Sequence, residues 1–135
     1  MVGNKFQDII LKYSRDNARE VVPTRYDFSA EEVNALCGDE VEVFVTINAE
    51  TLDISYHRKG CALCAASAAI MGECVSGRDR PFGIAIVQRF LKDFPQGKVI
   101  SDQGIGIEAL FDMRRFPARE RCVLLPWQAL IRCLS

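Results

Sequence analysis

The sequence predicts an α+β domain in which helices pack on one face of a small antiparallel β-sheet of about three strands. Two segments alternate apolar and polar residues on either side of a short polar turn, and segments before and after them repeat apolar residues at helical spacing. The length agrees with this class, because 135 residues can bury one hydrophobic core but not two. We therefore expect residues 1–135 to form a single domain.

The N-terminal part predicts an amphipathic helix over residues 4–17. Its apolar residues share one face of such a helix: Phe6, Ile9, Ile10 and Tyr13. A charged stretch from Arg19 to Arg25 follows, and Pro23 prevents it from continuing the helix. Tyr26 and Phe28 then alternate with polar residues, which is a weak signal for an edge strand.

The clearest strand is expected over residues 41–47, where apolar and polar residues alternate. The alternation resumes over residues 52–57, after the short polar turn at residues 48–50. Two strands joined in this way predict an antiparallel hairpin.

Sequence features typical of helices follow the hairpin. The alanine-rich run after Gly60 predicts a helix over 62–76, with Gly77 at its C-terminal cap. Asp79 and Pro81 suit the cap and first turn of the next helix. We assign the apolar residues repeated every fourth position in that helix to the core: Phe82, Ile86, Phe90 and Phe94.

The C-terminal third predicts a loop at 95–106, which is rich in glycine and proline, and a short helix at 107–113. A last helix carries an apolar stripe: Leu124, Trp127, Leu130, Ile131 and Leu134. Because proline is tolerated in the first turn of a helix, Pro126 predicts that this helix begins within residues 122–125. Cys122 would then lie at or just before its positive end.

Charge and hydropathy exclude several kinds of partner. The chain has 17 basic and 18 acidic residues and a net charge of −1, so nothing indicates binding to nucleic acid or to an anionic membrane. No segment approaches the roughly 20 apolar residues that cross a bilayer, and the N-terminus lacks the apolar run of a signal peptide. We therefore expect a cytoplasmic protein whose six cysteines are thiols, metal ligands or nucleophiles.

Three of these cysteines lie at junctions between predicted elements. Cys37 precedes the hairpin, Cys61 lies where its second strand gives way to a helix, and Cys122 lies at the start of the last helix. Side chains at such junctions converge at one pole of a small domain, and a helix N-terminus favours a thiolate. With Asp39, they supply the four ligands of a tetrahedral zinc ion or of one edge of an iron–sulfur cluster. The sequence thus predicts a metal site at the rim of the sheet.

The other thiols allow several interpretations. Cys64 forms a CxxC pair with Cys61, but the antiparallel hairpin before it is not the setting of a thioredoxin-type site. Cys74 and Cys133 are expected to be small buried residues late in helices.

Three cationic or titratable residues flank the junctions. Lys59 and Arg121 lie close in sequence to junction cysteines, where either could hold a thiolate or persulfide or could simply be solvated. His57, the single histidine, is expected to be a solvated strand residue.

Three segments closely resemble iron–sulfur cluster assembly scaffold proteins of the IscU, NifU N-terminal and SufU type: Cys37–Val43, Lys59–Ala68 and Phe116–Trp127. The resemblance covers most of the chain from Cys37 to Leu130. Two features resemble the SufU branch in particular. The gap between Cys61 and Cys122 leaves room for an insertion within residues 80–105, and Arg121 stands where the IscU branch usually has histidine.

The resemblance implies a site that holds zinc, a transient iron–sulfur cluster, or both, through Cys37, Asp39, Cys61 and Cys122. It implies Cys122 as the first persulfide acceptor, with Cys61 second and Arg121 beside it. Cys64 stands at a position that is usually small and not a thiol, which makes it an alternate ligand, a relay thiol or an inert residue.

The implied partners are a cysteine desulfurase, which supplies persulfide sulfur, and downstream iron–sulfur acceptor proteins. The implied role is a scaffold or sulfur acceptor rather than a conventional enzyme. Residues 12–17 only faintly resemble the N-terminal pattern of the family, and the Leu-Pro-Pro-Val-Lys motif of the IscU branch is absent. Other interpretations are a zinc-dependent sulfurtransferase that never hosts iron, a module with a structural zinc, and a dithiol redox protein using Cys61 and Cys64.

Overall fold

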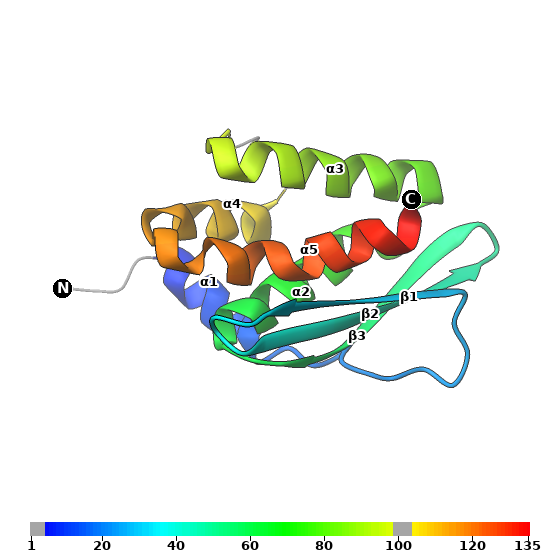
Figure 1. Cartoon of the computed structure of the whole chain (residues 1–135). Helices are drawn as coiled ribbons and strands as arrows, with labels where there is room; N and C mark the ends of the chain where they lie inside the picture. The colour runs from blue at the N-terminus through cyan, green and yellow to red at the C-terminus, as the bar shows by residue number, and fades with distance from the viewer. Residues whose placement is uncertain (1–4, 99–103) are drawn as a thin grey trace.

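The computed structural model of the chain describes residues 5–98 and 104–135. A three-stranded antiparallel sheet in the order β1-β2-β3 forms one layer, and the helices lie on one face of it (Figure 1). Its strands are β1 (Phe28–Asn34), β2 (Asp39–Asn48) and β3 (Thr51–Lys59). The predicted α+β class with a three-stranded antiparallel sheet is therefore confirmed.

The helices form two groups. α2 and α5 lie directly against the sheet, α3 packs beyond α5, and α1 contacts both α2 and α4 at one end of the molecule (Figure 1). Their bounds are α1 (Lys5–Ser14), α2 (Ala62–Val75), α3 (Arg80–Gln96), α4 (Ile105–Asp112) and α5 (Glu120–Leu134). No helix in the described part of the chain is long and apolar enough to cross a membrane.

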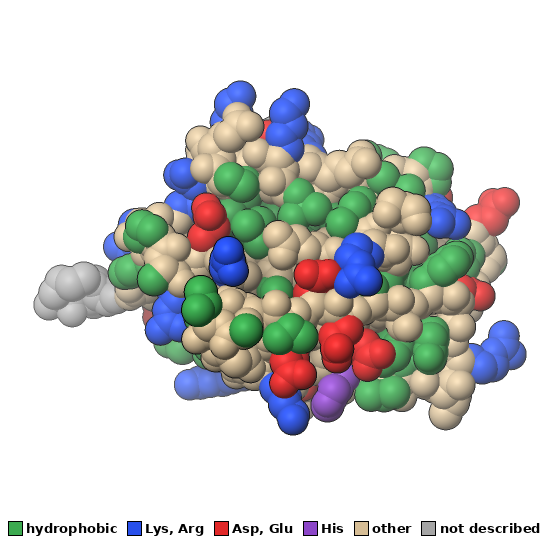
Figure 2. Space-filling model, in the orientation of Figure 1, with side chains coloured by type: hydrophobic (Ala, Val, Ile, Leu, Met, Phe, Trp, Pro, Cys, Tyr) green, Lys and Arg blue, Asp and Glu red, His purple; other side chains and the backbone are tan. Residues whose placement is uncertain are grey.

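The register of the sheet separates a buried face from an exposed one. Val43 on β2 pairs with Tyr56 on β3, and both are buried under the helices, as the alternation of the sequence predicts. On the opposite face Glu42 pairs with Glu31 on one side and with His57 on the other. His57 is exposed, and Figure 2 shows it in purple beside a group of acidic side chains.

Aromatic rings form the centre of the helical layer. The rings of Trp127 and Phe90 stack with their centroids 3.9 Å apart, and Phe111 meets Phe90 edge-on. Phe90 and Phe94 are buried as predicted, but Phe82 is 52% exposed and lies under the Arg78 guanidinium. The prediction of Phe82 as a core residue is wrong, because the first turn of α3 packs through the buried Gly83, while Phe82 lines an open pocket with Ile86 and Arg78.

Several element boundaries differ from the predictions. α1 ends at Ser14 rather than at residue 17, and the first strand occupies Phe28–Asn34 rather than the 26–28 region. α3 continues through Pro95 to Gln96, and α4 begins at Ile105 rather than at residue 107. The expected helix start at residue 4 and the middle of the expected 95–106 loop, within the 80–105 insertion, lie outside the described residues.

The start of the last helix was predicted wrongly. α5 begins at Glu120, so Pro126 lies inside it and not in its first turn. An interior proline removes one backbone hydrogen bond and costs about 3 kcal/mol. The surrounding residues of α5, including Trp127 and Leu130, are fully buried, and that burial outweighs the cost.

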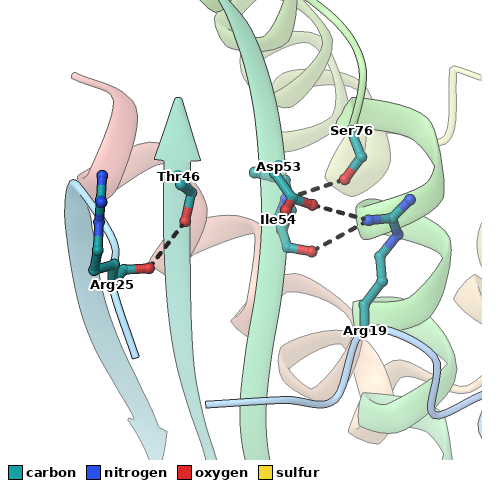
Figure 3. Close-up of polar contacts among 6 residues, drawn as sticks. All are labelled: Arg19, Arg25, Thr46, Asp53, Ile54 and Ser76. Carbon is teal, nitrogen blue, oxygen red and sulfur yellow. Dashed lines mark hydrogen bonds and ion pairs between the residues drawn. The ribbon is translucent and has the colours of Figure 1, made fainter. Parts of the chain in front are cut away.

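The connection between α1 and β1 is bound to the edge of the sheet by Arg19. Its guanidinium donates to Asp53 Oδ1 and to the carbonyl oxygen of Ile54, both at 3.4 Å (Figure 3). The backbone N–H of Tyr56 donates to the carbonyl oxygen of Arg19 at 3.0 Å. Ser76, just after α2, accepts a hydrogen bond from the Ile54 N–H at 3.1 Å, which joins the end of α2 to β3.

The same connection then crosses the exposed face of the sheet. The Thr46 hydroxyl donates to the carbonyl oxygen of Arg25 at 3.4 Å (Figure 3), and the Tyr26 ring lies 5.0 Å from the ring of Phe44. Phe44 is only 3% exposed although it points away from the helices. Arg25 and Tyr26 therefore cover the Thr46 and Phe44 side of this face, while His57 and Glu31 on the same face stay exposed.

Candidate metal centre

The turn between β1 and β2 carries the first two candidate ligands. The N–H groups of Cys37 and Gly38 both donate to the carbonyl oxygen of Asn34, at 3.2 and 2.9 Å, and Gly38 has φ +73°. The turn is therefore tight, and it leaves Cys37 exposed while Asp39, the first residue of β2, is fully buried. The two side chains meet at one end of the sheet.

The junction between β3 and α2 adds Cys61 to this pair. The Cys61 N–H donates to Asp39 Oδ1 at 2.9 Å, and the Cys61 thiol donates to Asp39 Oδ2 at 3.7 Å. Gly60 adopts φ +138°, and a Cβ atom there would lie 2.1 Å from Asp39 Oδ1. Only glycine leaves room for the carboxylate, a requirement that the sequence analysis did not identify.

The first turn of α5 completes the group with Cys122, which is fully buried. Among the described residues, the ligand atoms of Cys37, Asp39 and Cys122 lie within 4.8 Å of one another. Cys61 is not one of this group of three, but its thiol lies 3.7 Å from Asp39 Oδ2. Three of the four residues that the sequence singled out are thus clustered, and the fourth contacts Asp39.

A buried serine positions α5, and with it Cys122, against α2. The Ser67 hydroxyl donates to the carbonyl oxygen of Val123 at 2.6 Å and accepts from the Trp127 indole N–H at 2.9 Å. All three residues are buried. The sequence analysis missed Ser67, although a single polar residue within a run of small and apolar residues in α2 is a signal that could have identified it.

Burial controls the protonation of the thiols at this site. It raises the pKa of Cys122, and the hydrogen bond to Asp39 and the neighbouring Cys61 raise it further. It also raises the pKa of Cys64 to about 12, with added contributions from Asp39 and Cys61. We expected the helix N-terminus to lower the pKa of Cys122, and this expectation is wrong because desolvation and the adjacent carboxylate dominate.

The remaining candidates lie around this group rather than in it. Arg121 and Lys59 are exposed, each next to a junction but directed to solvent. Cys64 is fully buried in α2, and Cys133 is 3% exposed in α5, as predicted for a core residue. Cys74 is only half-buried.

The donor set fits a thiophilic metal ion. Zinc–thiolate bonds of about 2.3 Å in a tetrahedral site place neighbouring sulfur atoms about 3.8 Å apart. The ligand atoms of Cys37, Asp39 and Cys122, within 4.8 Å of one another, need a contraction of at most about 1 Å to reach that spacing, and Cys61 Sγ lies outside that group. Three thiols and one carboxylate are also a set that zinc and iron–sulfur clusters both accept.

Residues 7–111 match the family model described as the NifU-like N terminal domain. The chain belongs to this family. The match confirms the family resemblance of the sequence, and it ends before Cys122, whose place in the site therefore rests on the geometry.

Individual proteins also resemble this chain in sequence. The chain is 33% identical over 100 residues to the zinc-dependent sulfurtransferase SufU of Bacillus subtilis, which covers 72% of this chain and 67% of the relative. It is 27% identical over 99 residues to the iron–sulfur cluster assembly scaffold protein IscU of Streptococcus pyogenes, which covers 72% of this chain but only 62% of that protein.

Solved structures share the fold. A protein assigned to iron–sulfur cluster assembly in the SUF system of Fervidobacterium islandicum AW-1 superposes with a TM-score of 0.86 at 23% identity, covering 95% of both chains. The N-terminal part of a NifU-like protein from Brucella abortus superposes with a TM-score of 0.79 at 22% identity, covering 93% of this chain and 88% of the other.

Proposed function

We propose that this chain is an iron–sulfur cluster assembly protein that accepts persulfide sulfur from a cysteine desulfurase and supplies downstream iron–sulfur acceptor proteins. The observation that carries the proposal is the convergence of Cys37, Asp39 and Cys122, which come from a hairpin turn and a distant helix, within 4.8 Å. Membership of the NifU-like family and the likeness to SufU and IscU support it. We also propose that residues 1–135 form one such domain.

In this proposal each residue has a distinct task. The Cys122 thiolate attacks the outer sulfur of the donor persulfide, so that a new S–S bond forms on Cys122 and the donor cysteine leaves as a thiolate. Exposed Cys37 faces the donor, and Asp39 fixes the position of Cys61 through the 2.9 Å bond to its N–H. A zinc ion held by Cys37, Asp39, Cys61 and Cys122 would keep these thiols deprotonated.

The first experiment tests Cys122 as the sulfur acceptor. Metal-loaded protein is incubated with desulfurase and cysteine, and the intact mass is measured without reductant. We expect wild type to gain one sulfur atom, about 32 Da, and Cys122→Ser to gain less than a tenth of that yield. Cys74→Ser is the matched control, because it removes a half-buried thiol elsewhere and should match wild type. A Cys122→Ser protein that gains sulfur at the wild-type yield would refute this role.

A second measurement separates a cluster scaffold from a sulfurtransferase that never hosts iron. Anaerobic protein receives iron, desulfurase and cysteine, and its metal content and visible spectrum are recorded. A scaffold develops thiolate-to-iron charge-transfer absorption that Cys37→Ala abolishes. Protein that gains sulfur and retains zinc, yet never develops this absorption, would instead be a sulfurtransferase.

A further inference from the structure

Cys64 is a buried thiol beside the site that the proposed function leaves unused. We propose that Cys64 is a resolving thiol, which attacks a persulfide carried on Cys61, releases its outer sulfur as sulfide and leaves a Cys61–Cys64 disulfide. The inference rests on the proposed function, because it needs persulfide sulfur at this site. It adds a reductive step, since persulfide sulfur must gain electrons before it becomes the sulfide of a cluster.

The local geometry places Cys61 and Cys64 at the two ends of the first turn of α2. Cys61 is the N-cap of α2, and its carbonyl oxygen accepts a hydrogen bond from the Ala65 N–H at 3.1 Å. Residues 61–65 thus form a closed first turn, in which side chains three positions apart have Cβ atoms about 5–6 Å apart. A disulfide needs Cβ atoms about 3.5–4.5 Å apart, so Cys61, as the N-cap residue, must move toward Cys64 by about 1–2 Å to close the bond.

Cys61 and Cys64 differ in burial, and in this proposal they therefore act at different steps of sulfur transfer. Cys61 is partly exposed, and its thiol and that of Cys122 both lie beside the Asp39 carboxylate, so sulfur delivered to Cys122 can pass to it. Cys64 is 0% exposed, whereas Cys61, three residues before it, is partly exposed. In this proposal sulfur therefore reaches Cys64 through Cys61.

The other two cysteines outside the metal group cannot take this part. Cys133 lies near the end of α5, where its thiol donates to the carbonyl oxygen of Val43 at 3.6 Å. Cys74 lies near the opposite end of α2 from Cys61. In the test below, Cys133→Ala is the control variant and Cys74 is replaced by serine in every protein.

Each step balances. In the first, the Cys61 thiolate attacks the outer sulfur on Cys122, which forms the Cys61 persulfide and frees the Cys122 thiolate. In the second, Cys64 attacks Cys61 Sγ. The new S–S bond forms, the bond to the outer sulfur breaks, and that sulfur leaves with the electron pair as hydrosulfide, which takes up the proton of Cys64. An external dithiol restores both thiols by exchange before another turnover.

The test follows disulfide formation and sulfide release in a Cys74→Ser background. In this background the tryptic peptide of residues 60–78 contains only Cys61 and Cys64. Zinc-loaded protein is charged with sulfur by desulfurase and cysteine in one arm, and by inorganic polysulfide followed by desalting in the other. Each sample is alkylated, and free sulfide is measured without added reductant.

We expect release of up to one sulfide per chain, together with a 60–78 peptide that carries no alkyl group. Adding Cys64→Ala should lower sulfide release at least tenfold, leave the persulfide in place and keep the zinc content, whereas Cys133→Ala should change none of these. The inference would be overturned if the Cys64→Ala protein released sulfide at the parental rate, or if no disulfide formed in the parental protein. Loss of zinc from the Cys64→Ala protein before it is charged with sulfur would also overturn it. If desulfurase transfers no sulfur, the proposed function fails by itself, and the polysulfide arm still decides the role of Cys64.

Discussion

At the scale of single residues, Gly60 determines whether the Asp39 carboxylate can occupy the centre of the metal group. A Cβ at residue 60 would meet Asp39 Oδ1 at 2.1 Å, in a backbone conformation with φ +138°. We expect Gly60→Ala to lower zinc affinity at least tenfold, about 1.4 kcal/mol, in a competition assay with a chromogenic chelator. Gly77→Ala is the control, because Gly77 also has positive φ but open space around it. Equal zinc affinity of the two variants would contradict this account.

The residues of the site differ in how far the sequence could predict them. The proximity of Cys37, Asp39 and Cys122, with Cys61 beside Asp39, could be predicted, because these residues stand at junctions that a compact fold brings together; their role as ligands stays a prediction. The protonation state of Cys122 could not be predicted. Its pKa depends on burial and on the distance to Asp39, which only the packing of α5 determines. The role of Gly60 likewise depends on a contact across 21 residues of chain that no local pattern records.

At the scale of elements, the position of Cys122 depends on how α5 is held against α2. Ser67→Ala removes the hydrogen bond to Val123 and leaves the buried Trp127 N–H without its partner. We expect the free energy of unfolding in urea to fall by about 1–3 kcal/mol. The emission of Trp127, the single tryptophan, should shift as its hydrogen bond is lost. Ser14→Ala, at the C-terminal end of α1 where the hydroxyl makes a solvent-exposed hydrogen bond, should change stability by less than about 0.5 kcal/mol. A similar effect of both variants would refute the link.

At several element boundaries, tertiary packing overrides the local sequence preferences for helices and strands. The strands β2 and β3 follow the alternation of the sequence because one face is buried and the other is not. Pro126 and Pro95, by contrast, lie inside helices that local rules would end or start there. The core contacts of α5 decide its length, and these contacts come from residues distant in sequence.

At the scale of the whole molecule, buried thiols and phenols make the metal-free protein sensitive to alkali. Burial raises the pKa of Cys133 from 9.0 to about 11, and burial with the nearby Glu20 and Asp16 raises that of Tyr56 from 10.0 to about 12. Both groups keep their protons in the folded chain at pH values where the unfolded chain has lost them. Their contribution to stability is therefore complete below pH 9 and is lost as the pH rises toward 11 and 12.

This sensitivity can be measured on reduced, metal-free protein by urea unfolding between pH 7 and pH 11. We expect a nearly constant free energy of unfolding up to about pH 8.5, then a decline whose slope approaches about 1.4 kcal/mol per pH unit for each buried group. Cys133→Ala removes one such group at a distance from the metal site, so it should reduce the slope between pH 9 and pH 11 by nearly that amount. If Cys133→Ala and wild type declined in parallel, the alkaline loss would have to come from charge repulsion over the surface instead of from the burial of individual groups.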